Sequence, residues 1–179
     1  MTIMDKMNTA TRMATQMIFD KESVNYLEAG ALYGIIAQGR FNEAVLQSMY
    51  NHAKDSDLRK LIKQCIDEQV TATVEDCEKA LEKGNGQVPK FHFNARQLHK
   101  EPLDIPTDAC LSDMEIAAAL GTMAKASQMA LLAALHQSYQ LDVGMMLRKR
   151  LDEGLDWNTR LLNLMLNRGW LPHITKVEH

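Results

Sequence analysis

The sequence has few of the residues that would assign a chemistry at once. Only three cysteines, Cys65, Cys77 and Cys110, occur in 179 residues, and none lies in a Cys-x-x-Cys spacing. Cys65 and Cys77 would lie about 18 Å apart on one helix, so they cannot form a disulfide bond. We therefore expect three reduced thiols in a cytoplasmic protein.

Sequence motifs for common reactions are also absent. The chain contains no phosphate-binding Gly-x-x-x-x-Gly-Lys-Ser/Thr loop, no Gly-x-Gly-x-x-Gly and no Gly-x-Ser-x-Gly. The net charge of −3 argues against a general nucleic-acid surface, which would be strongly basic. No window of about 18 apolar residues occurs, so we expect no membrane span. An enzymatic activity is not indicated, and we expect no cofactor.

What the chain does contain is helical periodicity. Apolar residues recur at a spacing of three and four in four long stretches, and no strand pattern of any weight is present. In the last stretch one face carries Leu147, Leu151, Leu155, Leu162 and Met165, with Asn158 among them. The predicted helices cover residues 23–53, 57–83, 112–140 and 145–168.

Helix boundaries are marked by local signals. Ser112 followed by Glu115 predicts a capping box at the start of the third helix. Gly169 predicts the end of the fourth, because glycine accepts the left-handed conformation that closes a helix. Three glycines inside the first helix, Gly30, Gly34 and Gly39, each cost about 1 kcal/mol relative to alanine. Two explanations stay open for them: close approach of another backbone, or simple tolerance.

The link between the second and third helices is unusually long. Residues 84–111 contain Pro89, Pro102 and Pro106 and have no periodicity, and such a link can cross the full length of a helix bundle. His92 and His99 lie in this link, where we expect surface histidines. Two short links and one long link match the ferritin-like four-helix up-down bundle with a single crossover, so we predict this all-α class.

Two segments carry a resemblance to known families. Residues 164–172, Leu-Met-Leu-Asn-Arg-Gly-Trp-Leu-Pro, resemble the ending of helix four in spore coat protein F-like proteins. Residues 51–89 resemble a related family of unknown function from spore-forming bacteria. The resemblance implies a ferritin-like bundle and a role in sporulation, and it brings no established activity.

A di-metal site of the ferritin type does not fit the sequence. Such a site needs two Glu-x-x-His pairs, and no glutamate here is followed by a histidine three residues later. Coat protein F-like sequences commonly carry a histidine 11 residues before the glycine of the Gly-Trp ending, and here that residue is Asn158. Since iron sites favour histidine and carboxylate ligands, we predict no transition-metal site between the helices.

Four polar residues are predicted on or beside the apolar stripes: Glu43, Gln69, Ser127 and Asn158. Buried polar groups need partners, so these residues are expected to form a hydrogen-bonded belt in the bundle centre. The alternative is a small-molecule pocket at the same place. The charged run Arg148-Lys149-Arg150 is interpreted as a solvated face.

We expect one domain over residues 23–172, with an N-terminal extension over 1–22 and a C-terminal tail over 173–179. The extension is either flexible or a docked helix. Two functional classes stay open. The first is a structural or interaction protein that forms a homo-oligomer, most simply a dimer, or joins a coat-like assembly, in the cytoplasm or with the spore. The second is a divergent metal-binding or small-ligand-binding protein or enzyme.

Overall fold

A computed structural model describes Met4, Met7, Thr11 and the ranges 23–106 and 108–171 of the chain. The first long helix, α2, covers Tyr26–His52. Asn25 Oδ1 accepts the backbone N–H groups of Leu27 (2.8 Å) and Glu28 (3.0 Å). In the opposite direction, the Glu28 carboxylate accepts the backbone N–H of Asn25 (3.1 Å). Asn25 therefore caps the helix. The helix begins at Tyr26, three residues after the start at Ser23 that the sequence predicted.

The second predicted helix is continuous but changes its winding. It consists of α3 (Ser56–Gln64), the π-helix η1 (Cys65–Val70) and α4 (Thr71–Lys83). A Cβ on Gly39 of α2 would overlap the side chain of Val74, so α2 and α4 approach closely there. A Cβ on Gly30 or Gly34 would meet no neighbouring atom within 4 Å. The missing side chain of Gly39 therefore makes room for the side chain of Val74, not for another backbone, and no neighbour requires a glycine at position 30 or 34.

The third and fourth helices are α5 (Asp113–Gln137) and α6 (Leu141–Arg168). The predicted capping box of α5 is confirmed, because the Glu115 N–H donates to Ser112 Oγ (3.3 Å) and the Ser112 N–H donates to the Glu115 carboxylate (2.8 Å). Gly169 ends α6 with φ of 68°, as predicted. α5 ends three residues earlier, and α6 begins four residues earlier, than the periodicity indicated.

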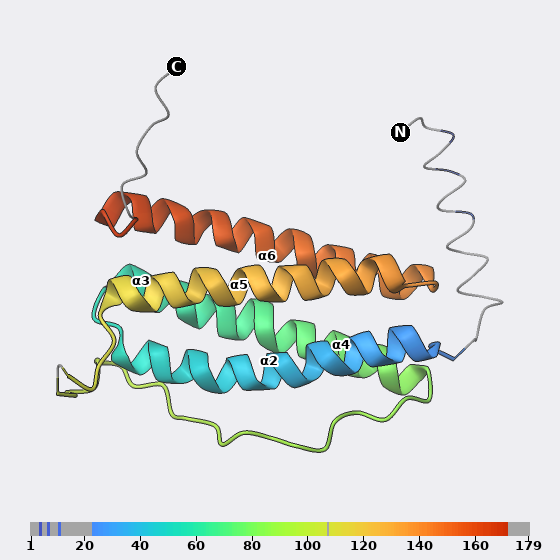
Figure 1. Ribbon diagram of the computed structural model, residues 1–179, viewed down its shortest axis with the longest axis horizontal. Helices are drawn as coiled ribbons and strands as arrows, with labels where there is room; N and C mark the ends of the chain where they lie inside the picture. Colours follow the sequence, from blue (N-terminus) through green and yellow to red (C-terminus); the bar gives the residue numbers. More distant parts are fainter. Residues whose placement is uncertain (1–3, 5–6, 8–10, 12–22, 107, 172–179) are drawn as a thin grey trace.

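The link between α4 and α5 runs along the outside of α2 (Figure 1). Side chains of α2 hold it in place. Arg40 Nη1 donates to the carbonyl oxygen of Phe91 (2.9 Å). Asn51 donates to the carbonyl oxygen of Gln97 (2.9 Å) and accepts the backbone N–H of His99 (2.9 Å). Polar residues on α2 are thus used to fix the backbone of the link, which has no secondary structure of its own to satisfy those groups.

The four helical segments lie side by side, and no strand occurs within the described ranges (Figure 1). α2 packs against α4 and α5, while α6 packs against α5 and α3. Following the colours of Figure 1, α2 and α6 run in one direction and α4 and α5 run in the other. This order differs from a simple alternating up-down order, because the link spans the full length of the helices before α5 begins.

Among the described helices, α5 alone is long and apolar enough to cross a membrane by length and composition. Core helices of soluble proteins pass the same test, and α5 packs against α2 and α6. The expectation that the chain has no membrane span therefore stays a prediction.

The buried apolar residues form two clusters, one toward each end of the helices. The first lies where α3 begins and α6 ends, and includes Leu46, Leu58, Ile62, Ile116, Leu120, Trp157 and Leu161. The second lies where α2 begins and α4 ends, and includes Leu32, Ile36, Val74, Cys77, Leu81, Leu131 and Leu147.

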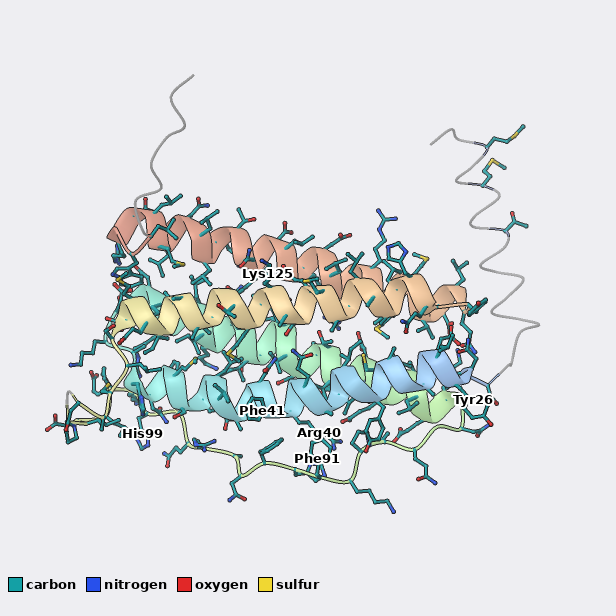
Figure 2. The ribbon with its side chains drawn as sticks, in the orientation of Figure 1. Tyr26, Arg40, Phe41, Phe91, His99 and Lys125 are labelled. Carbon is teal, nitrogen blue, oxygen red and sulfur yellow. The ribbon has the colours of Figure 1, made fainter. Side chains whose placement is uncertain are left out.

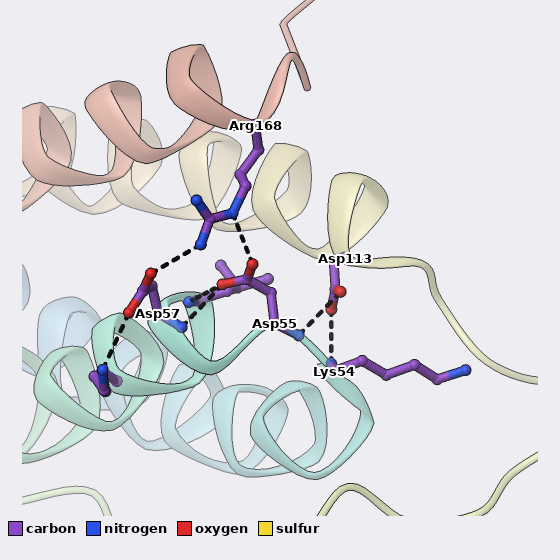
Figure 3. Close-up of polar contacts among 7 residues, drawn as sticks. Lys54, Asp55, Asp57, Asp113 and Arg168 are labelled. Atoms are coloured by element: carbon purple, nitrogen blue, oxygen red, sulfur yellow. Dashed lines mark hydrogen bonds and ion pairs between the residues drawn. The ribbon is translucent and has the colours of Figure 1, made fainter.

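A cluster of charged residues closes the first end (Figure 3). Arg168, the last residue of α6, donates from Nε to Asp55 (2.8 Å) and from Nη2 to Asp57 (2.8 Å). The Asp113 carboxylate accepts the backbone N–H groups of Lys54 (2.7 Å) and Asp55 (3.0 Å). The Arg-Gly-Trp ending of α6 therefore contributes packing and ion pairs that join α6 to the turn before α3.

These contacts change the acidity of the two aspartates. Burial raises the pKa of Asp55, but hydrogen bonds from Arg168 and from the backbone N–H groups of Leu58 and Asp57 outweigh it, so the pKa lies below its ordinary value. The hydrogen bond from Lys60, followed by that from Arg168, also lowers the pKa of Asp57. Both carboxylates are stabilised in their charged form.

Candidate functional site

A cavity of about 90 Å³ lies between the two apolar clusters. Its walls come from α2, η1, α4, α5 and α6, so every long segment contributes to it. Leu46, Leu120, Leu131 and Trp157 form part of its apolar lining. The indole of Trp157 is fixed in place because its Nε1–H donates to the carbonyl oxygen of Leu61 (3.0 Å). We call this space the central cavity.

The polar lining of the central cavity is rich in amides. Two of these side chains are held by hydrogen bonds, since Asn42 donates to Ser127 Oγ (3.2 Å) and Gln128 donates to the carbonyl oxygen of Gly154 (3.0 Å). The cavity therefore contains a partly bonded polar layer between two apolar clusters. Its uncharged polar residues are Gln38, Asn42, Gln69, Thr73, Ser127 and Gln128.

The charged residue in the lining is Arg150, whose side chain is only 11% exposed. Its Nε and Nη2 donate to Asp76 Oδ2 (2.9 and 2.5 Å), and its Nη1 donates to Glu153 (2.8 Å). Burial lowers the pKa of Arg150, but the contacts with Asp76 and Glu153 outweigh it and raise the pKa above its ordinary value. The guanidinium stays charged, and the two carboxylates are committed to it.

The structure brings two of the four predicted belt residues to the cavity. Gln69 and Ser127 line it, whereas Glu43 and Asn158 do not. Glu43 is half-buried on α2 and accepts a hydrogen bond from Gln47 (3.2 Å). Two of the predicted belt residues therefore lie at the cavity, and the other polar residues there are not the ones that the periodicity suggested.

Asn158 is not in the place that its neighbours implied. It is half-buried and makes no hydrogen bond to another described residue, while Leu155 and Leu162 on either side are 47% and 46% exposed. The buried face of α6 includes Leu147 and Met165 of the predicted stripe, but its other large residues are Trp157, Leu161 and Leu164. Asn158 is therefore half-buried rather than buried, because the part of the stripe that contains Leu155, Asn158 and Leu162 lies at the edge of the buried face.

Sequence reasoning missed five of the polar lining residues: Gln38, Asn42, Thr73, Gln128 and Arg150. Arg150 was expected on a solvated face with its two charged neighbours, and this expectation was wrong for Arg150. A signal for its burial was present, because Arg150 lies three residues after Leu147 and four before Gly154, on the face that continues to Trp157 and Leu161. Asp76 on α4 supplied a candidate partner.

Within the described ranges, no three His, Cys, Asp or Glu side chains come together in a way that could hold a metal ion. All three cysteines are unpaired. Burial raises the pKa of the Cys65 and Cys77 thiols to about 12, so neither is a thiolate at neutral pH. The chemistry available at the central cavity is hydrogen bonding by amides and hydroxyls.

Comparisons with known proteins identify the family of the chain. A family model described as "Protein of unknown function (DUF3231)" matches residues 13–177. The uncharacterized protein YvdQ of Bacillus subtilis (strain 168) is 26% identical over 156 residues, which are 84% of this chain and 86% of that protein. These findings confirm the predicted resemblance to a family of unknown function from spore-forming bacteria.

Two solved structures have a similar fold. A candidate spore coat protein from Bacillus halodurans C-125 has a TM-score of 0.79 at 22% identity, covering 88% of this chain and 98% of that one. A conserved hypothetical protein from Mycobacterium tuberculosis has a TM-score of 0.62 at 15% identity, covering 79% and 99%. At these identities the likeness is one of fold.

Proposed function

Because the chain belongs to the DUF3231 family of proteins of unknown function, we propose that it is a ferritin-like four-helix bundle that has no di-metal site and acts as a structural or interaction protein. The long link along the outside and the shared direction of α4 and α5 support the ferritin-like topology. The likeness of its fold to that of a candidate spore coat protein supports a place in or near the spore.

The observation that carries this proposal is the position of Arg150. In ferritin-like metal sites, carboxylates that project into the bundle centre bridge the ions. Here Asp76 and Glu153, the carboxylates beside the cavity-lining Arg150, are bonded to its guanidinium instead. Both carboxylates are engaged by Arg150, so neither is free to ligate a divalent cation, and releasing them would leave a buried arginine without partners.

An exposed aromatic patch supports the interaction role. Phe41 on α2 and Phe93 on the link have ring centroids 5.6 Å apart, and Phe91 lies 5.9 Å from Phe93. All three are between 40% and 52% exposed, and Figure 2 shows Phe41 and Phe91 beside Arg40 on one side of the molecule. Exposed aromatic groups of this kind are enriched at the centres of protein interfaces.

The proposed partner at this aromatic patch is a second copy of the chain. A stable interface buries about 800 Å² on each partner, so the three phenylalanines would form its centre and neighbouring parts of α2 and the link its rim. The full chain should therefore have the mass of a dimer in light scattering. Phe93→Ser should shift that mass to a monomer.

Tyr26→Ser provides the matched control, because Tyr26 is 99% exposed and lies at the start of α2, away from the patch (Figure 2). It should leave the mass unchanged. In a sporulating Bacillus host, the tagged full chain should fractionate with purified spore coats. A monomeric wild-type chain that is absent from the coat fraction would contradict the structural role.

A further inference from the structure

The central cavity has more hydrogen-bonding capacity than the protein itself uses. The side chains of Gln38, Gln69 and Thr73 line it and make no hydrogen bond to another described residue. Asn42 and Gln128 each use their amide N–H, and no hydrogen bond to a described residue reaches their carbonyl oxygens. Donors and acceptors are therefore both available to a molecule inside.

The charge of the lining restricts what that molecule can be. Arg150 is matched by Asp76 and Glu153, so the cavity presents no unbalanced positive charge to an anion and no uncommitted carboxylate to a cation. Much of the remaining wall is apolar, including Ile35 and Met123. A ligand that carries a charge would lose its hydration without gaining an ionic partner, which is unfavourable.

A second, independent observation points to the same place. Cys65, Gln69 and Val70 of the π-helix η1 all line the cavity. A π-turn inserts one extra residue into a helix, and such turns are found frequently at functional sites. The irregular turn in this chain therefore coincides with the polar lining.

We propose that the central cavity binds a small uncharged molecule with an amide or hydroxyl group on a short apolar body. Its polar group lies between Gln69 and Gln128, and its apolar part lies against Leu120, Leu131 and Trp157. This binding is separate from the proposed structural role, and neither depends on the other.

Gly154 offers a way to narrow the cavity without disturbing the fold. A Cβ at this position would lie 3.8 Å from Gln128 and 3.9 Å from Gln69 Oε1, which is ordinary van der Waals contact. Gly154→Ala therefore places a methyl group between the two amides and also favours the helix. Gly144→Ala is the matched control, because it lies on the same helix, meets Leu135 and Ser138 at 3.7 Å and does not line the cavity.

The probe is isobutyramide, with isobutyrate as its anionic analogue of the same shape. The chain has two tryptophans, so its nitrogen-correlated NMR spectrum contains two indole signals. Trp157 lines the cavity and Trp170 does not, which makes Trp170 an internal control. Isobutyramide should shift the Trp157 signal saturably, with a millimolar dissociation constant, and should bind at least tenfold more tightly than isobutyrate.

Gly154→Ala should raise the dissociation constant for isobutyramide at least tenfold while raising the unfolding midpoint. Gly144→Ala should leave the dissociation constant unchanged. Three outcomes would overturn the proposal: no saturable shift of Trp157, tighter binding of isobutyrate, or equal loss of affinity in both alanine variants. A monomeric chain absent from the spore coat would count against the structural role and would leave this result untouched.

Discussion

Glu28→Ala should destabilise the protein far more than Glu115→Ala, although both glutamates hold the same position in a capping box. Glu28 is 1% exposed, and its second carboxylate oxygen accepts the backbone N–H groups of Tyr139 (2.6 Å) and Gln140 (2.8 Å). These bonds join the start of α2 to the turn between α5 and α6. Glu115 is exposed, and its bonds stay within its own capping box.

The expected magnitude follows from the two additional bonds. Hydrogen bonds to a charged group contribute about 1.5–3 kcal/mol each, and the partly buried donors favour the lower end of this range. Glu28→Ala should therefore lower the free energy of unfolding by about 3 kcal/mol beyond the loss of the cap. That difference is roughly a hundredfold in the folding equilibrium.

Urea unfolding followed by circular dichroism measures both variants under the same conditions. The unfolding midpoint should fall much further for Glu28→Ala, with the slope of the transition unchanged. Equal losses in the two variants would refute the reasoning, because they would mean that the bonds to the α5–α6 turn contribute nothing to stability.

Three further predictions concern other parts of the chain. Asn158→Leu should change the free energy of unfolding by no more than about 0.5 kcal/mol, because the amide makes no bond to a described residue; a large loss in thermal unfolding would show an essential partner. Arg168→Gln should lower the unfolding midpoint at neutral pH. Since the folded pKa of Asp55 lies below its ordinary value of 3.8, this stabilisation is present above pH 3.8 and is lost as the pH falls through the folded pKa, so the two midpoints should converge in acid. Cys110 should react with a thiol reagent in the folded protein well before Cys77, which is fully buried with its pKa raised to about 12; mass spectrometry of the labelled chain identifies the site, and equal rates would contradict the burial.

Local signals in the sequence predicted the helix ends better than the helix faces. The Ser112–Glu115 box and the left-handed Gly169 depend on a few neighbouring residues, and both are confirmed. The buried face of α6 depends on which helices lie beside it. Trp157 and Leu161 are buried while Leu155 and Leu162 are half-exposed, a choice that apolar spacing on one helix cannot make.

The π-helix was missed although a weak signal for it exists. Leu58, Ile62, Ile66, Val70 and Val74 follow one another at a constant spacing of four residues. In a regular α-helix this spacing drifts around the axis, because 3.6 residues make a turn. Widening one turn to a π-turn absorbs part of that drift, so a long run of four-residue steps favours an irregular segment near its middle.

The sequence predicted a polar layer in the bundle centre, but it identified only some of the residues that form it. Gln69 and Ser127 were identified because they interrupt apolar stripes. Asn42 could not be identified in this way, because its burial depends on Ser127 on another helix. Arg150 was missed although it interrupts the face of Leu147, Trp157 and Leu161. Partners distant in the sequence decide whether a polar side chain enters a core.

The proposal that the bundle has no di-metal site, because Arg150 holds Asp76 and Glu153, is tested most directly by manganese titration. Electron paramagnetic resonance distinguishes free Mn²⁺ from bound Mn²⁺ on the dialysed full-length chain. The Arg150 guanidinium, bonded to Asp76 and Glu153, predicts that the free-ion signal grows in proportion to added manganese from the first addition. Loss of one or two equivalents of that signal at the start of the titration would contradict the claim.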